Sequence, residues 1–160
     1  MEAGKAKIDM GGLACLLHSS VFSLEKSIQE IMGRDHIVLT SHAAKYIAAI
    51  DEKKGSRLFF GKSLDEAIKN FVDLTSGSEF FDSLDIKKTN GEEYRVDIKG
   101  CALAKTGVHN VLNPELDICP MALAAGAVFK YIEPDSDVIL KPSSFEDEGS
   151  STEIAVVKII

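Results

Sequence analysis

The first third of the chain carries apolar residues at the spacing of amphipathic helices. One helix is expected over residues 12–31, where apolar positions recur every three or four residues and Gly33 supplies a C-cap. A second is expected over residues 36–50. A third covers residues 64–74, and Ser63 with Glu66 forms a capping box at its start. The pattern therefore predicts three helices before residue 80.

The period then changes to the alternation typical of strands. Residues 81–87 and 94–99 alternate around Asn90-Gly91, the strongest short hairpin signal. Residues 138–140 and 153–160 predict a second strand pair, with an acidic loop at 146–151 between them. Local pairing of strands gives an antiparallel sheet, so the predicted class is α+β. We expect N-terminal helices packed on a sheet of two β-hairpins that flank a buried central helix.

That central helix is the most apolar part of the chain. Residues 121–132 contain one charge, Lys130, so the helix is expected to be buried on nearly every side. Pro120 suits the first helical position, which puts Cys119 at or beside the N-cap. Because the free N–H groups and the dipole there favour a thiolate, we expect Cys119 to be more acidic than a free cysteine.

Composition narrows the class of protein. With 160 residues, of which 45% are hydrophobic and 27% charged, the chain fits one soluble domain spanning residues 1–160. A net charge of −7 argues against nucleic acid as a partner. No stretch is apolar enough for membrane insertion, and no signal peptide is evident, so a cytoplasmic location is expected. In that reducing compartment, the three cysteines favour thiols or ligands over disulfides.

A metal site is the first candidate for the chemistry. Cys101, His109 and Cys119 follow the spacing C-x7-H-x9-C, and thiolates with imidazole suit zinc or iron with one open position. If residues 101–112 formed one helix, Cys101 and His109 would lie about 12 Å apart, too far to share an ion. A shared ion needs a break, which Gly107 or the turn at 113–114 could provide. The structural alternative is two buried thiols and a hydrogen-bonded histidine.

A cysteine nucleophile is the second candidate. His109 would act as base for Cys119, with Asp117 or Asn113 orienting the histidine, in a hydrolase or reductase. Pro120 weakens this interpretation, because it removes one N–H from the natural oxyanion hole at the helix start.

An apolar ligand pocket is the third candidate. Small residues dominate the central helix, and they either allow close packing or leave a cavity. The ligand-binding residues expected beside such a cavity are Leu123, Val128, Phe129 and Tyr131.

The first helix carries two faces that are not polar. Cys15 and His18 stand three residues apart, a spacing that lets two side chains share one ion. The alternative is a small buried cysteine with a histidine at the helix edge. The other face carries leucine, isoleucine and valine. The two faces together favour core packing on one side of the helix and a partner or ligand on the other.

Three segments of the second half resemble a known family: KGCALAKTGVHNV (99–111), DICPMALAAGAVFKYI (117–132) and VILKPSSF…GSSTEIAVV (138–157). They are similar to the 4-vinyl-reductase-type, or hydrocarbon-binding, domains that are common in archaea and as bacterial sensory modules. That family belongs to a wider superfamily of ligand-binding domains in nitric-oxide signalling and Golgi transport. Its members usually carry a cysteine on a late strand, whereas this chain has none beyond Cys119. The resemblance implies an apolar pocket, a homodimer and binding rather than catalysis.

These observations favour a sensor or carrier that binds a small apolar molecule or a soft metal and forms a homodimer. The alternatives are the cysteine-dependent hydrolase or reductase, and a dimeric scaffold whose apolar helix face binds a protein partner.

Overall fold

A computed structural model describes residues 10–33, 36–55, 59–76, 78, 80–105 and 107–159; for Cys15, His18 and several other helical residues it describes the backbone alone. The helical elements are α1 (Met10–Met32), α2 (His36–Lys54), α3 (Leu64–Thr75), α4 (Ala102–Lys105), the short 3-10 helix η1 (Val108–Val111) and α5 (Pro120–Ile132). Within the described ranges, no helix has the length and apolar character needed to cross a membrane.

One antiparallel sheet accounts for the described strands. They are β1 (Ser83–Asn90), β2 (Glu93–Lys99), β3 (Ser136–Leu140), β4 (Ser144–Glu146) and β5 (Gly149–Lys158). The order across the sheet is β1-β2-β5-β3, and β4 pairs with the beginning of β5. The two hairpins flank α5 in the sequence, so the predicted α+β fold class is confirmed.

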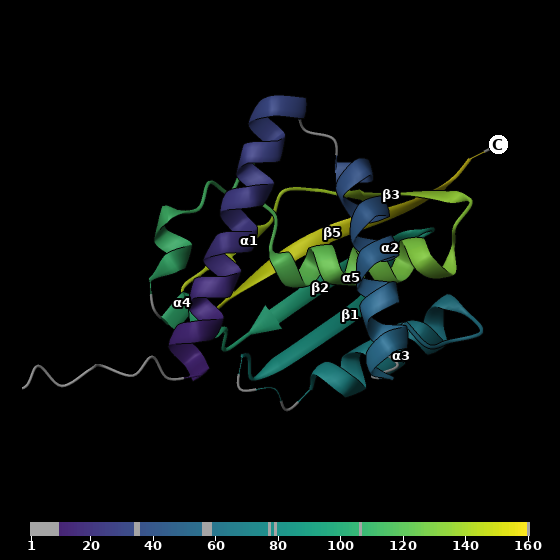
Figure 1. The fold of residues 1–160 in the computed structure, drawn as a ribbon, viewed down its shortest axis with the longest axis horizontal. Coiled ribbons are helices and arrows are strands. Elements are labelled where there is room, and N and C mark those ends of the chain that lie inside the picture. Colours follow the sequence, from purple (N-terminus) through teal and green to yellow (C-terminus); the bar gives the residue numbers. More distant parts are fainter. Residues whose placement is uncertain are drawn as a thin grey trace, which may run out of the picture.

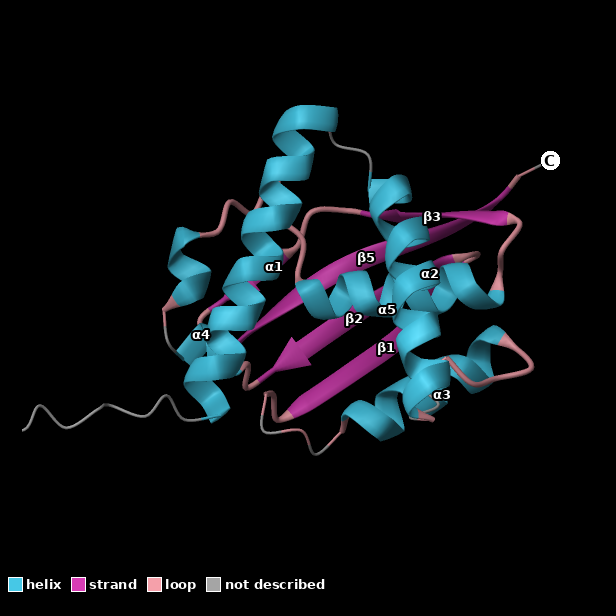
Figure 2. Cartoon of the chain, in the orientation of Figure 1, coloured by secondary structure: helices cyan, strands magenta, loops and turns pink. Residues whose placement is uncertain are grey.

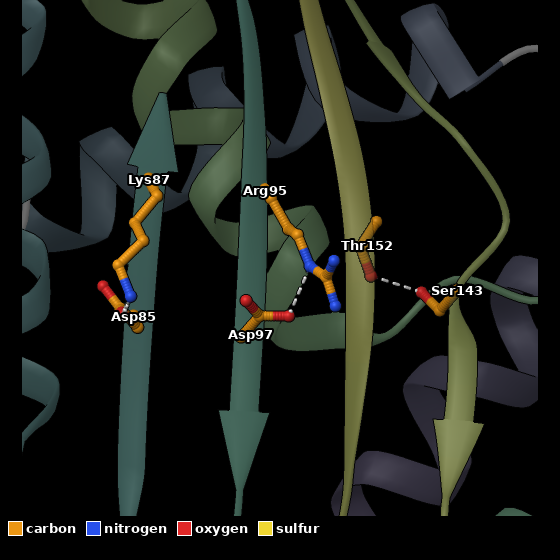
Figure 3. Close-up of polar contacts among 6 residues, drawn as sticks. All are labelled: Asp85, Lys87, Arg95, Asp97, Ser143 and Thr152. Atoms are coloured by element: carbon orange, nitrogen blue, oxygen red, sulfur yellow. Dashed lines mark hydrogen bonds and ion pairs between the residues drawn. The ribbon is translucent and has the colours of Figure 1, made fainter. Parts of the chain in front are cut away.

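The helices gather on one face of the sheet (Figures 1 and 2). α5 crosses the strands and packs against β3, while α2 and α3 pack against α5. Phe129 of α5 is fully buried, and its ring meets that of Tyr94 on β2 edge-on, with centroids 4.9 Å apart. The opposite face carries ion pairs, including Arg95 with Asp97 and Lys87 with Asp85 (Figure 3). The core therefore lies between the helices and one side of the sheet.

Local signals placed most of these elements correctly. The Ser63 hydroxyl accepts the N–H of Glu66 at 3.3 Å, as expected of a cap on α3. Gly91 adopts φ +51° in the turn between β1 and β2, a left-handed conformation that glycine adopts without strain. The segment predicted as an acidic loop over residues 146–151 is instead a tight hairpin turn, with β4 ending at residue 146 and β5 beginning at 149.

Candidate functional site

Cys119 occupies the N-cap of α5, with Pro120 in the first turn as predicted. The N–H of Cys119 donates to the hydroxyl of Ser143 at 2.7 Å, and that hydroxyl lies 2.5 Å from the hydroxyl of Thr152 on β5 (Figure 3). Ser143 is fully buried, so this network is shielded from water. These bonds fix the start of α5 against the sheet.

A cavity of about 350 Å³ lies beside this helix start. Its walls come from separate parts of the chain: Ser19 of α1, Leu74 at the end of α3, Ile98 of β2, Leu103 of α4 and Met121 of α5. Further lining residues are Phe80, Phe81, Leu112 and Phe145. Nearly all the exposed atoms of the lining are apolar.

The cavity brings together the three residues predicted from the sequence, because Cys101, His109 and Cys119 all line it. Cys101 is half-buried, and its N–H donates to the carbonyl of Glu148 in the β4–β5 turn at 3.0 Å. The helical path is interrupted between α4 and η1, where Gly107 adopts a left-handed conformation with φ +77°. This is one of the two places where a break was expected.

His109 is held from one side of its ring. Nδ1 lies 3.0 Å from the carbonyl oxygen of Glu146, and because a carbonyl only accepts, Nδ1 carries the proton. Nε2 is then the nitrogen able to accept a hydrogen bond. The imidazole ring also packs edge-on against the ring of Phe145, with the two ring centroids 5.1 Å apart. Asp117 does not take the orienting role proposed for it, since its carboxylate accepts the N–H of Asn113 at 2.6 Å.

The predicted acidity of Cys119 is wrong. Burial raises the pKa of its thiol above the usual value, although the hydroxyl of Ser150 and the N–H groups of Ala122 and Met121 act in the opposite direction. The N–H groups at the helix start lower the pKa of the thiol, as expected. The cost of placing a thiolate in an apolar interior raises the pKa by more. At neutral pH the thiol is protonated.

The geometry does not support a shared metal ion. Among the described residues, no group of three or more His, Cys, Asp and Glu side chains is arranged to hold one. Cys101, His109 and Cys119 therefore share a cavity without forming a coordination centre for zinc or iron. The side chains of Cys15 and His18 lie outside the described part of the structure, so their role stays a prediction.

The four expected ligand-binding residues lie away from this cavity. Val128 and Phe129 are buried in the core, and Leu123 is half-buried. Tyr131 is half-exposed, and its ring centroid lies 5.2 Å from that of Phe59. None of the four is among the lining residues. The cavity adjoins the first turn of α5, whereas these residues occupy its later turns.

No family model matches the chain, and no curated protein matches it. A trafficking protein particle complex subunit 3 from Naegleria fowleri, covalently bound to palmitic acid, aligns with a TM-score of 0.49 at 9% identity, over 94% of this chain and 96% of that chain. An H-NOX family protein, solved to probe the function of heme distortion, aligns with a TM-score of 0.47 at 11% identity, over 98% of this chain and 77% of that chain. Similarity at this level carries no argument about function, and the resemblance to 4-vinyl-reductase-type domains stays a prediction.

Proposed function

We propose that this chain binds one small, uncharged, mainly apolar molecule in the cavity at the start of α5, as a sensor or carrier domain. The observation that carries the proposal is the cavity itself, an apolar space of about 350 Å³. Packed interiors leave few voids larger than a water molecule, and small-molecule sites begin at roughly 300 Å³. A space of this size and polarity is what such a ligand requires.

The polar groups of the lining are few and weak. They are the two thiols, the His109 ring and the hydroxyls of Ser19, Thr75 and Ser78. Such groups can fix the orientation of one hydroxyl or carbonyl of a ligand, while the apolar walls supply most of the binding energy. The net charge of −7 disfavours an anionic ligand at long range. These features together favour an uncharged molecule.

Cysteine-dependent catalysis is less well supported. A thiolate is the nucleophile in such enzymes, and burial raises the pKa of Cys119. His109 shares the cavity with Cys119, and the bond of its Nδ1 to the carbonyl of Glu146 leaves Nε2 as an acceptor, so the protonated thiol is the feature that disfavours this chemistry. Binding therefore fits the arrangement better than hydrolysis or reduction does.

Met121→Trp should abolish most binding of an apolar probe. Met121 lines the cavity and is half-buried, so the larger indole would fill the space that the probe needs. We expect the Kd for 1-aminoanthracene, a neutral fluorescent probe, to rise by at least about tenfold, which corresponds to about 1.4 kcal/mol. Fluorescence titration of the purified full chain measures this change directly.

Leu123→Trp is the matched control for that experiment. Leu123 lies on the same helix, is also half-buried, and is not part of the lining. The Kd of this variant for the probe should stay within about twofold of the Kd of the unmodified chain, a change of less than about 0.4 kcal/mol in binding free energy. Loss of binding in Leu123→Trp with retention in Met121→Trp would refute the proposed site and favour a pocket along the later turns of α5.

A further inference from the structure

Two thiols face the same cavity and have no part in holding the fold together by a covalent bond. Cys101 is half-buried and Cys119 is buried, and within the described ranges both are free thiols. Both residues line the space at the start of α5. Packed interiors leave little room for a side chain to change its rotamer, whereas this cavity provides open space beside the two residues. The pair can therefore change its bonding without displacing the core.

One hairpin anchors both cysteines. The N–H of Cys101 donates to the carbonyl of Glu148 at 3.0 Å. The hydroxyl of Ser150 donates to the thiol of Cys119. Glu148 and Ser150 stand two residues apart where the β4–β5 turn enters β5, so their Cα atoms are separated by at most about 7 Å. A disulfide joins residues whose Cα atoms lie roughly 4.5–7 Å apart, and two neighbouring anchor points on one hairpin are suited to that spacing.

The two thiols also influence each other electrostatically. The pKa of Cys119 is raised first by burial, and negative charge on Cys101 raises it further. Like charges act on one another in this way when they lie close together in a site of low polarity. This effect agrees with the two hydrogen bonds to the hairpin, because both place the cysteines side by side.

We propose that Cys101 and Cys119 are a redox-sensing pair that closes to a reversible disulfide when an uncharged hydroperoxide enters the cavity. Cys101 reacts first, because it is the less buried of the two. Its sulfur bonds to the terminal peroxide oxygen, the O–O bond breaks, and the alcohol leaves with the thiol proton, so that Cys101 becomes a sulfenic acid. The sulfur of Cys119 then bonds to that of Cys101, the S–O bond breaks, and the hydroxyl leaves as water with the second thiol proton. The two sulfurs together lose two electrons, which the hydroperoxide gains.

The walls of the cavity favour this class of oxidant. Nearly all the exposed atoms of the lining are apolar, and the chain has a net charge of −7, so a charged oxidant such as glutathione disulfide is disfavoured. Nε2 of His109, in the same lining, is able to accept the hydrogen of a hydroperoxide. The choice of oxidant rests on the proposed ligand site, whereas the disulfide itself does not.

Cumene hydroperoxide tests the pair in the full chain carrying Cys15→Ser, which leaves Cys101 and Cys119 as its thiols. Mass spectrometry of the reduced chain after treatment should show the loss of two hydrogens, and chromatography should show one molecule of the corresponding alcohol released per chain. Digestion should yield two peptides joined through Cys101 and Cys119, and the unmodified chain should yield the same pair. Dithiothreitol should restore both thiols.

Single variants test the order of the two steps. Cys119→Ser should stop at a sulfenic acid on Cys101, which dimedone labels. Cys101→Ser should react at least about tenfold more slowly, because the remaining thiol is buried and protonated. Faster oxidation of Cys101→Ser than of Cys119→Ser would contradict the assigned order.

Oxygen gained without a linkage, or a linkage of Cys101 to a second chain, would overturn the pairing. Oxidation that is faster with glutathione disulfide than with cumene hydroperoxide at equal concentration would overturn the choice of oxidant. Binding of 1-aminoanthracene by the reduced chain is measured separately. A disulfide without probe binding would refute the ligand site and uphold the pairing, and probe binding without a disulfide would refute the pairing alone.

Discussion

Gly149→Ala is expected to lower the free energy of unfolding by at least about 3 kcal/mol, the upper part of the range for overpacked interiors. A Cβ atom at this position would lie 1.9 Å from the carbonyl oxygen of Ile98. Gly149 pairs with Lys99 on β2 and with Glu146 on β4, so relief requires backbone movement in the sheet. In a chain of this size, thermal unfolding should begin roughly 6–12 °C lower.

Gly91→Ala provides the comparison for this prediction. Gly91 has open space around its Cα and a left-handed backbone, with φ +51°. Alanine there should cost only about 1–2 kcal/mol, the strain of that conformation. Denaturant unfolding of both variants measures the two costs. If Gly149→Ala were no less stable than Gly91→Ala, the result would contradict the close approach of Gly149 on β5 to the carbonyl oxygen of Ile98 on β2.

Glu25→Gln is expected to stabilise the protein increasingly as pH rises. The pKa of Glu25 is raised from 4.5 to about 7, first by burial and second by the charge of Asp117. A raised pKa means that the native state binds the proton more tightly than the unfolded chain, so stability is lost as pH rises from 4.5 toward 7. Glutamine is never charged and escapes this loss. Its stability advantage should grow by about 2 kcal/mol between about pH 5.5 and 8.

Denaturant unfolding at several pH values measures this advantage, and Glu30→Gln is the control. Glu30 is exposed on the same helix, so its substitution should leave the pH dependence as it is in the unmodified chain. An advantage of Glu25→Gln that did not change with pH would contradict the burial of this carboxyl group against the body of the protein.

Local signals in the sequence were sufficient for most of the secondary structure. The turn at Gly91, the cap at Ser63 and the proline at the start of α5 each depend on neighbouring residues alone, and each lies where it was expected. The pairing of β2 with β5 could not be predicted in this way, because 49 residues or more separate the partners, as in Lys99 with Gly149. The loop predicted at residues 146–151 includes the first three residues of β5, because glycine and serine at 149–151 carry no local signal for a strand.

Three of the residues that line the cavity were singled out from the sequence. Cys101, His109 and Cys119 were chosen for their chemistry, and all three line one cavity. The acidity of Cys119 was misjudged, because the sequence shows the helix start beside this residue but not how deeply its thiol is buried. The apolar lining residues gave no local signal. They come from segments spread between residues 19 and 145, and only the folded chain brings them together.

The most direct test of the proposed cavity uses the methionine methyl groups. The chain has four methionines, and Met121 is the one whose side chain the structure describes; it lines the cavity. In the full chain labelled with 13C-methyl methionine, titration with 1-octanol should shift the NMR signal of Met121 in a saturable way. A Met121 signal that does not move, while 1-octanol binds elsewhere or not at all, would contradict a ligand site at the start of α5.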